Sequence, residues 1–364
     1  MREVLARSVY GVAESPVLRL EGLTKRFGDR AALSNVSFSL NAGEYVSLLG
    51  PSGSGKTVLL RAIAGFETPE EGRVFIAGEH VTRQPAHLRG IGFVFQNFAL
   101  FPHLTVFDNV AFGLRHGTNK HPDAEVRTRT LAVLDLVGLK GLEGRGVHQI
   151  SGGQKQRVAL ARTLVIQPKL VLLDEPLGAL DANLRLRMRG ELRRIRELLG
   201  IPFLHVTGSE TEALAMGDRL IVLDRGQVGQ QGRPGDIYER PANPNVARFL
   251  NRYNVFDGAI ADGVFVTSYG KFPLGPRVPS AKPAYAVRYD RVIAKPPEGG
   301  ALATISATYV ASEYLGSAIV HFFEAPDGKV VEVEHHLSNG PPDAFSSGQT
   351  YSLTWKPEDG IAFG

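Results

Sequence analysis

The stretch Gly50-Pro51-Ser52-Gly53-Ser54-Gly55-Lys56-Thr57 decides the fold of this chain, because it has the spacing of a phosphate-binding loop: glycine, four residues, then Gly-Lys-Thr. The apolar run 44–49 precedes it and predicts a buried strand, and the run 58–65 predicts a helix that ends at a glycine. The alternative is a Gly/Ser-rich turn that binds no phosphate and whose lysine is solvated. The strand and the helix on either side favour the phosphate-binding loop.

Each residue type in this loop has a chemical reason. Glycines let the backbone curl, so that successive N–H groups converge on an anion. The start of the following helix adds partial positive charge at the same place. We therefore expect Lys56 to reach the β- and γ-phosphates of a nucleoside triphosphate, and the Thr57 hydroxyl to ligate Mg²⁺.

The composition limits the remaining possibilities. The chain has 364 residues, 43% of them hydrophobic, a formal charge of +4 and no cysteine. Its pI near 9.2 reflects a mild excess of basic residues, which is too small to indicate a nucleic-acid-binding protein. Without cysteine there are no disulfides, no thiolate zinc site and no cysteine nucleophile.

Residues 1–16 are predicted to be a loose leader that lacks the apolar core of a signal peptide. No apolar run approaches the roughly 20 residues that a membrane-spanning helix needs. We therefore expect a cytosolic protein that reaches a membrane only through its partners.

The pattern of residues 17–250 predicts an α/β domain with a parallel sheet and an antiparallel β edge at its start. Alternation of apolar and polar residues over 17–20 and 31–40 indicates half-buried antiparallel strands. The segment from about 97 to 167 is predicted to be a helical subdomain. The other predicted strands are 72–78, 91–95, 170–173, 203–206 and 220–223, and the predicted helices are 105–114, 124–137, 153–166 and 183–199.

From residue 251 onward the character of the sequence changes. Short strand-like runs alternate with Gly, Pro and Asp, and Pro326-Asp327-Gly328-Lys329 has the composition of a hairpin turn. This pattern predicts a second, all-β domain over 251–364, a small barrel with a regulatory or dimerisation role.

The helix 183–199 carries a stripe of arginines that could contact nucleic acid. It lacks the interleaved aromatic residues of such a surface, so a solvated or acid-paired helix face is the favoured interpretation. The stripe consists of Arg185, Arg187, Arg189, Arg193, Arg194 and Arg196.

Two further stretches narrow the type of nucleotide site. The apolar run 170–173 ends in Asp174 and Glu175; Asp174 can hold Mg²⁺ through water, and Glu175 can orient or deprotonate a water at the γ-phosphate. Two acids after an apolar run are also common at plain strand ends. The stretch Ile150-Ser151-Gly152-Gly153-Gln154 is more specific, because a serine cap followed by two glycines makes a second anion cradle at a helix start.

Taken together, these stretches resemble the ATP-binding-cassette family, in which the segment Ser151-Gly152-Gly153-Gln154 is the family signature. The resemblance implies that the signature of one subunit closes over the ATP held by the phosphate loop of another. It therefore implies a head-to-tail dimer, or pairing with a second ATPase, with two ATP molecules between the subunits.

The resemblance also assigns roles to single residues. Gln96 looks like the glutamine that contacts Mg²⁺ and water. Phe27 looks like the aromatic residue that stacks on adenine, although a single exposed Phe can also occur without any function. Asp181 matches the loop that crosses the dimer interface. The segment 97–105 matches the groove that receives a helix of a membrane permease, provided that its apolar residues are exposed and not packed into the core: Phe98, Leu100, Phe101 and Pro102.

The similarity is highest to ATPases of bacterial importers that depend on a periplasmic binding protein, within the polyamine and ferric-iron group. It rests on the stretches 101–106, 178–185 and 236–241, and on the junction 249–256. The region after residue 251 resembles the TOBE-like barrel that these importers append. The resemblance implies a peripheral subunit at the cytoplasmic face of the inner membrane that contacts the permease directly and the binding protein only indirectly.

The sequence departs from the family at one position. After the strand 203–207, where the family has a histidine that contacts the γ-phosphate, this chain has Gly208. His205 lies three residues earlier, and the favoured interpretation is that it is a packed strand residue. Ser209, Glu210 or water replaces the missing contact, or hydrolysis is slow and depends on Glu175, or a second ATPase supplies the histidine.

Two functions remain open at this point. The leading hypothesis is the energising ATPase of an importer, in which ATP binding closes the dimer and hydrolysis at Glu175 resets it. The alternative is an ATP-dependent switch with little turnover that serves regulation or assembly, and Gly208 is its support. A repair-type ATPase acting on nucleic acid is disfavoured, because the chain lacks a long coiled-coil insertion.

Overall fold

The computed structural model describes residues 15–117, 120–178, 180–296 and 304–364. The chain divides into two compact units, Met1–Ile237 and Tyr238–Gly364. Most of the predicted leader, residues 1–14, lies outside the described residues.

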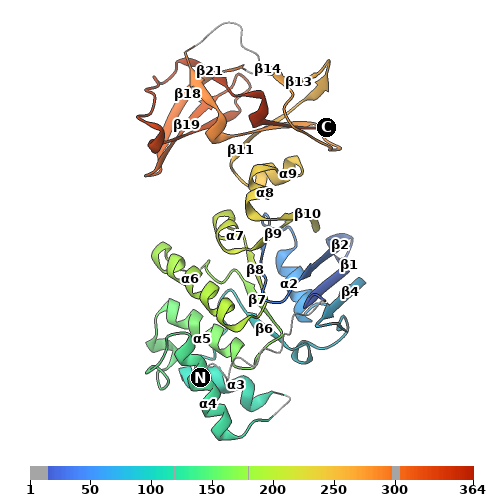
Figure 1. The fold of residues 1–364 in the computed structure, drawn as a ribbon, viewed down its shortest axis with the longest axis vertical. Helices are drawn as coiled ribbons and strands as arrows, with labels where there is room; N and C mark the ends of the chain where they lie inside the picture. The colour runs from blue at the N-terminus through green and yellow to red at the C-terminus, as the bar shows by residue number, and fades with distance from the viewer. Residues whose placement is uncertain (1–14, 118–119, 179, 297–303) are drawn as a thin grey trace. The chain divides into compact units, whose positions relative to one another are not determined.

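A six-stranded sheet forms the centre of the first unit (Figure 1), in the order β10-β9-β3-β8-β7-β6. The pairs β9–β3, β3–β8, β8–β7 and β7–β6 are parallel, and β10 pairs antiparallel with β9 at one edge. The carboxyl ends of the parallel strands therefore meet at one edge, where ligands bind in sheets of this kind. The strands are β3 (Tyr45–Leu49), β6 (Ile91–Val94), β7 (Leu170–Asp174), β8 (Phe203–Thr207), β9 (Arg219–Asp224) and β10 (Gln227–Gly232).

The buried strands of this sheet carry apolar side chains on both faces, as covered parallel strands do. Val46, Leu48 and Leu172 face a core shared with the helix α2 (Lys56–Ala64). Their chain neighbours Tyr45 and Val171 belong to a second core, shared with the helices between β6 and β8. Because side chains alternate along a strand, one sheet separates these two cores.

An antiparallel sheet covers the α2 side, in the order β2-β1-β4-β5. Its strands are β1 (Leu18–Phe27), β2 (Arg30–Leu40), β4 (Glu71–Ile76) and β5 (Glu79–His80). The predicted antiparallel β region at the start of the chain is confirmed, and it forms a sheet of its own that packs on the same core as α2.

Helices occupy the segment between β6 and β7, as the sequence predicts. They are α3 (Val106–His116), α4 (Asp123–Leu136) and α5 (Gly152–Leu164). Two further helices flank β8: α6 (Ala182–Leu199) and α7 (Glu210–Met216). The Thr105 side chain caps α3, Ser151 caps α5, Asp181 caps α6 and Ser209 caps α7, so local sequence fixes where each helix begins.

The second unit begins within α8 (Pro234–Glu239), continues through α9 (Pro244–Phe249), and is otherwise built from strands. Its sheets have the orders β11-β16-β22-β15, β12-β13-β14 and β17-β21-β18-β19-β20, which confirms the all-β prediction. Gly328 N–H donates to the Ala325 carbonyl (2.9 Å) and closes the predicted hairpin turn. The strands are β11 (Tyr253–Asp257), β12 (Ala259–Ala261), β13 (Val264–Thr267), β14 (Gly270–Pro273), β15 (Arg277–Val278), β16 (Ala284–Arg288), β17 (Ile293–Lys295), β18 (Thr304–Tyr314), β19 (Ala318–Glu324), β20 (Val330–His336), β21 (Thr350–Thr354) and β22 (Gly360–Phe363).

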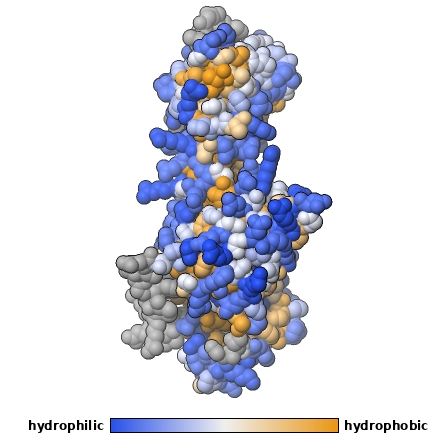
Figure 2. Space-filling model, turned by 90° about the vertical axis from the view of Figure 1, so that its right-hand side faces the viewer, coloured by the Kyte–Doolittle hydropathy of each residue, from blue (hydrophilic) through white to orange (hydrophobic). Residues whose placement is uncertain are grey.

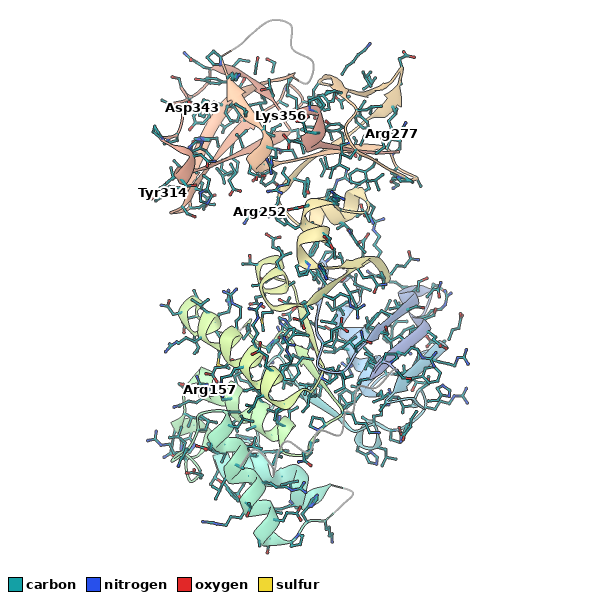
Figure 3. All side chains as sticks on the ribbon, in the orientation of Figure 1. Arg157, Arg252, Arg277, Tyr314, Asp343 and Lys356 are labelled. Atoms are coloured by element: carbon teal, nitrogen blue, oxygen red, sulfur yellow. The ribbon has the colours of Figure 1, made fainter. Side chains whose placement is uncertain are left out.

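Aromatic side chains form the core of this unit. Phe256, Phe272, Tyr285 and Trp355 contact one another, and the Trp355 indole N–H donates to the Tyr285 hydroxyl (3.0 Å). Tyr314, by contrast, is 69% exposed at the end of β18 (Figure 3). Aromatic burial of this extent lets a small β unit stabilise itself.

The coloured surface on the face drawn in Figure 2 is mainly hydrophilic. Hydrophobic colour in Figure 2 is confined to separate patches on the face turned to the viewer. Among the described residues, no helix is both long enough and apolar enough to cross a membrane.

Candidate nucleotide site

The loop between β3 and α2 adopts the form that its sequence predicts. Lys56 starts α2 directly after Gly55, and its side-chain Nζ donates to the main-chain oxygens of Gly50 (2.7 Å) and Pro51 (3.0 Å). Burial lowers the pKa of Lys56, while the nearby carboxylates of Glu175 and Asp174 act in the opposite direction. The Lys56 ammonium is therefore close enough to Asp174 and Glu175 to interact electrostatically with both carboxylates.

Two glycines of this loop are required for different reasons. Gly55 has φ 102°, and a Cβ there would lie 2.4 Å from the Ala32 carbonyl oxygen. Gly53 has φ 76°, but a Cβ there would meet no atom within 4 Å. Gly55 is thus needed for close packing, whereas Gly53 gives the loop its turn and leaves space beside it.

The predicted acids lie at the carboxyl end of β7. Asp174 ends the strand, and burial together with the charge of Glu175 raises its pKa. Glu175 has φ 43°, a conformation that non-glycine residues seldom adopt and that is found most often at functional sites. The Gln96 side-chain amide donates to Glu175 Oε2 (2.9 Å), so these two predicted site residues are in direct contact.

Gly208 lies opposite Glu175, at the carboxyl end of the neighbouring strand β8. A Cβ added to Gly208 would be 4.0 Å from Glu175 Oε1 and closer than that to no other atom. Its φ lies outside the left-handed region. The position therefore has space and a backbone suited to a side chain, although the sequence places none there.

His205 does not take over this position. Its side chain is fully buried in β8, and burial lowers its pKa to about 3. Neither ring nitrogen has a hydrogen-bond partner, and Nε2 lies 3.9 Å from Glu212 Oε2. The prediction that His205 is a packed strand residue is confirmed.

The signature segment forms a reciprocal cap at the start of α5. Ser151 Oγ accepts from Gln154 N–H (3.4 Å), and Gln154 Oε1 accepts from Ser151 N–H (2.8 Å). Gly153 packs against α6, where a Cβ would lie 2.8 Å from Leu184 Cδ1, while a Cβ at Gly152 would meet nothing within 4 Å. Ser151 and Gly152 are exposed, so this corner presents polar groups outward.

The remaining predicted site residues are exposed at the surface of the protein. Phe27 is 51% exposed at the end of β1, with the Lys25 ammonium 5.2 Å from its ring centroid. Ser52 and Thr57 are exposed, and Asp181 is exposed while its side chain accepts from Leu184 N–H (2.9 Å).

One part of the predicted permease groove is wrong. Phe98 is only 9% exposed and belongs to the core, and Leu100 packs against that same core. The reason is Arg162 of α5, which donates to the main-chain oxygens of Phe98 (2.8 Å) and Ala99 (2.6 Å) and holds the loop on the helix. Pro102 remains exposed.

Sequence reasoning missed an exposed aromatic cluster nearby. Phe66 is 46% exposed and Phe95 38%, and both rings lie within 6.0 Å of each other, with Phe93 between them at 5.5 Å and 4.4 Å. The apolar alternation that identifies β6 also marks Phe93 and Phe95. Only the fold brings Phe66, at the end of α2, beside them.

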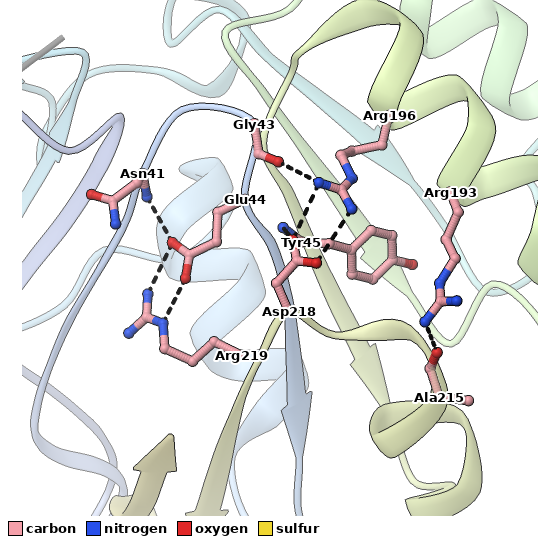
Figure 4. A network of polar contacts seen from close by, with 9 residues as sticks. All are labelled: Asn41, Gly43, Glu44, Tyr45, Arg193, Arg196, Ala215, Asp218 and Arg219. Carbon is pink, nitrogen blue, oxygen red and sulfur yellow. Dashed lines mark hydrogen bonds and ion pairs between the residues drawn. The ribbon is translucent and has the colours of Figure 1, made fainter. Parts of the chain in front are cut away.

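Most arginines of the stripe on α6 contact carboxylates or main-chain carbonyls of this protein. This agrees with the sequence-based preference for a solvated or acid-paired helix face over a nucleic-acid surface. Arg196 contacts Asp218 (3.2 Å) and donates to the Gly43 carbonyl (2.8 Å), and Arg193 donates to the Ala215 carbonyl at the end of α7 (Figure 4). Arg194 pairs with Glu191 (3.2 Å). Arg185 contacts Glu212 (3.5 Å), so four of the six arginines in the stripe have these partners within the protein.

The donors around the loop fit a nucleoside triphosphate with its Mg²⁺. Ser54 Oγ is buried without a hydrogen-bond partner, the space at Gly53 is open, and Lys56 is held only by main-chain oxygens. The Thr57 hydroxyl, the Gln96 amide oxygen and the Asp174 carboxylate are the hard oxygen ligands that Mg²⁺ prefers.

Comparison with known proteins agrees with this site. The ABC transporter family model matches residues 33–178, and the TOBE domain model matches residues 285–363. The chain is 41% identical to the spermidine/putrescine import ATP-binding protein PotA of Rubrobacter xylanophilus, over 93% of this chain and 91% of that protein. It is 39% identical to the protein of the same name from Vibrio vulnificus, over 98% and 96%.

Solved structures resemble the first unit. A dimeric ATP-binding cassette in a post-hydrolysis state with ADP and phosphate has a TM-score of 0.53 and 34% identity, over 60% of this chain and 98% of that one. A nucleotide-free ATP-binding cassette from an ABC transporter has a TM-score of 0.58 and 28% identity, over 65% and 98%.

Proposed function

Since the chain belongs to the ABC transporter family, in the group of import ATP-binding proteins with a C-terminal TOBE domain, we propose that it energises the uptake of a polyamine-class solute by binding and hydrolysing ATP. The observation that carries the ATPase function is the placement of Lys56, Asp174, Glu175 and Gln96 at or just after the carboxyl ends of parallel strands in one sheet, with Lys56 in the field of both acids and Gln96 bonded to Glu175. The solute class is supported by the names of two relatives that align with nearly the whole chain, both of which are spermidine/putrescine import ATP-binding proteins.

ATP binding is the task of residues 50–57. The main-chain N–H groups of this loop and the start of α2 supply donors and partial positive charge to the phosphates. Lys56 exchanges its two main-chain acceptors for phosphate oxygens, and Phe27 offers its exposed ring to adenine. Mg²⁺, when bound by Thr57, Gln96 and Asp174, neutralises charge on the phosphates.

Hydrolysis depends on the groups around Glu175. Its carboxylate orients the attacking water and accepts a proton from it, and the Gln96 amide holds the carboxylate in place. No side chain at position 208 faces the same region. We therefore expect ATP binding to be intact and hydrolysis to be present but slow.

Assembly completes the site. The exposed corner formed by Ser151, Gly152 and Gly153, with Gln154 fixed by its cap, would meet the nucleotide of a second copy in a head-to-tail dimer, or that of a second ATPase. Asp181 would lie at the same interface. The dimeric cassette among the similar structures supports this arrangement.

The membrane partner is a permease, and the protein is peripheral at the cytoplasmic face of a bacterial inner membrane. The exposed rings of Phe66 and Phe95, together with Pro102 in the segment 97–105, supply an apolar surface for a permease helix. A periplasmic binding protein contributes only through the permease. Residues 17–250 would be the ATPase domain and residues 251–364 the regulatory or dimerisation domain.

The alternative of an ATP-dependent switch with little turnover rests on Gly208 alone. Full-length similarity to import proteins favours the importer, and the intact pair of Gln96 and Glu175 favours turnover. Slow hydrolysis with no permease partner would instead favour the switch.

Two measurements test the proposal. The purified chain should hydrolyse ATP, and Glu175→Gln should abolish hydrolysis while nucleotide affinity stays within roughly twofold. A deletion strain should lose uptake of labelled spermidine and putrescine, and the wild-type gene should restore it while Lys56→Ala does not. Undiminished polyamine uptake together with lost ferric-iron uptake would refute the solute class but retain the importer.

A further inference from the structure

Arg185 connects the loop that follows Glu175 to the loop that contains Gly208. It lies in the first turn of α6, where a positive charge is unfavourable to the helix dipole, so its position needs a specific partner. It has two: Nη2 donates to the Leu180 main-chain oxygen (3.0 Å), and Nε lies 3.5 Å from Glu212 Oε1.

The Leu180 end of this link belongs to the loop that begins at Glu175. Gly178 N–H donates to the Glu175 carbonyl (3.2 Å), and Leu180 N–H donates to the Leu177 carbonyl (3.2 Å). These two hydrogen bonds form one turn that starts at Glu175 and one that starts at Leu177. A displacement of Leu180 is passed to Glu175 through these turns, while Glu175 N–H is also held by the Val206 carbonyl of β8 (2.9 Å).

The Glu212 end belongs to the loop around Gly208. Glu212 is 4% exposed, and its Oε2 accepts from the Thr207 hydroxyl (2.9 Å). Thr207 Oγ1 in turn accepts from Ser209 N–H (3.0 Å), and Ser209 Oγ accepts from Glu212 N–H (3.3 Å). Thr207 is thus bonded directly to the Glu212 carboxylate, and Ser209 is connected to it through the Thr207 hydroxyl.

The charge of Glu212 means that this link needs a cation. Its two ion-pair contacts among the described residues are with Arg185 and His205, and the buried, neutral His205 offers no positive charge. Removal of Arg185 therefore leaves a buried carboxylate without a cation and also frees the Leu180 carbonyl.

We propose that Arg185 is a positioning residue that holds the loop 175–181 against the loop 207–210, and so fixes the direction of the Glu175 carboxylate for hydrolysis. This inference rests on the proposed function of Glu175. Because position 208 has no side chain, that residue cannot hold Glu175 in place, and the bridge through Arg185 adds to the hydrogen bond that Gln96 donates to Glu175.

The central variant is Arg185→Met, which keeps the aliphatic stem and removes the donors. We expect kcat to fall roughly tenfold, while KM and nucleotide affinity stay within roughly twofold, because the phosphate loop is untouched. The matched control is Arg193→Met, which cuts another link between α6 and α7 eight residues further along α6 (Figure 4), and should leave kcat within twofold of wild type.

A double variant separates positioning from simple charge balance. Arg185→Met combined with Glu212→Gln removes the unpaired carboxylate, so thermal stability should recover to that of the wild type. The link to Leu180 stays cut, so kcat should stay low. Recovery of kcat in the double variant, an equal loss in Arg193→Met, or unchanged kcat in Arg185→Met would each overturn the proposal.

Hydrogen–deuterium exchange of the full chain gives a readout that does not require turnover. Arg185→Met should increase amide exchange in both 175–181 and 207–210, and leave that of 50–57 unchanged. If Glu175→Gln still hydrolyses ATP, the proposed function of Glu175 fails, and the exchange result decides separately whether Arg185 joins the loops. Unchanged exchange in both loops refutes the link itself.

Discussion

Replacing Gly208 with histidine should accelerate ATP hydrolysis. The site has space for the first side-chain atom, since a Cβ at this position would meet only Glu175 Oε1, at 4.0 Å. The backbone φ lies outside the left-handed region, so a side chain adds no backbone strain. Ser209 caps α7 immediately afterwards, and the positive end of this short helix favours a neutral imidazole that can donate to developing negative charge.

The expected size of the effect follows from what one polar donor contributes. Removing a donor aimed at developing charge typically costs roughly 10²–10³ in rate. The wild-type chain retains Lys56, Gln96 and Glu175, and a donor added to an unselected site is imperfectly placed. We therefore expect Gly208→His to raise kcat by about tenfold to a hundredfold, or about 1.4 to 2.7 kcal/mol of activation free energy.

The assay compares steady-state ATP hydrolysis by wild type, Gly208→His and Gly208→Ala at saturating MgATP. The alanine variant fills the Cβ position without adding a donor, so it should match the wild type within roughly twofold. Equal or lower turnover in the histidine variant, with its fold intact, would refute the reasoning and show that this chain completes its site in another way.

Three other outcomes follow from the structure. Lys56→Ala should weaken ATP binding by roughly tenfold to a hundredfold, measured with a fluorescent nucleotide, because it removes charge-assisted hydrogen bonds to phosphate. Burial lowers the pKa of His205 from 6.5 to about 3, so protonation favours the unfolded chain; the stability present above pH 6.5 is lost as the pH falls towards 3. Between pH 6.5 and 5 this amounts to about 2 kcal/mol in denaturant unfolding, and an equal loss in His205→Leu would contradict it. Phe98→Ala should cost about 3–5 kcal/mol of folding stability as a core truncation, and a change of less than about 1 kcal/mol would contradict its placement in the core.

Local signals in the sequence were sufficient for most elements. The phosphate loop is recognisable because its glycines, its lysine and the flanking apolar runs are contiguous, and α5 because Ser151 and Gln154 cap it reciprocally. The strand β10 was not predicted, since Gln227–Gly232 has almost no apolar residues and gains its place only by pairing with β9.

Long-range contacts account for what the sequence did not predict at the site. The burial of Phe98 depends on Arg162, 64 residues later in the chain. Apolar composition alone fits an exposed groove and a packed loop equally well. Likewise, the arginine stripe could be assigned to paired residues, but the partners Glu212, Ala215 and Asp218 become neighbours of α6 only when β8 is placed next to β7.

The contact of Gly153 with Leu184 couples the beginnings of two helices. A Cβ at this position would lie 2.8 Å from two carbon atoms of the Leu184 side chain, so the leucine keeps its present position only while residue 153 is glycine. Ser151 caps α5 and Asp181 caps α6, so a movement of either exposed cap presses on the other helix through this contact. Glycine at this position thus keeps the two helix starts packed together, in addition to any room it leaves for a nucleotide.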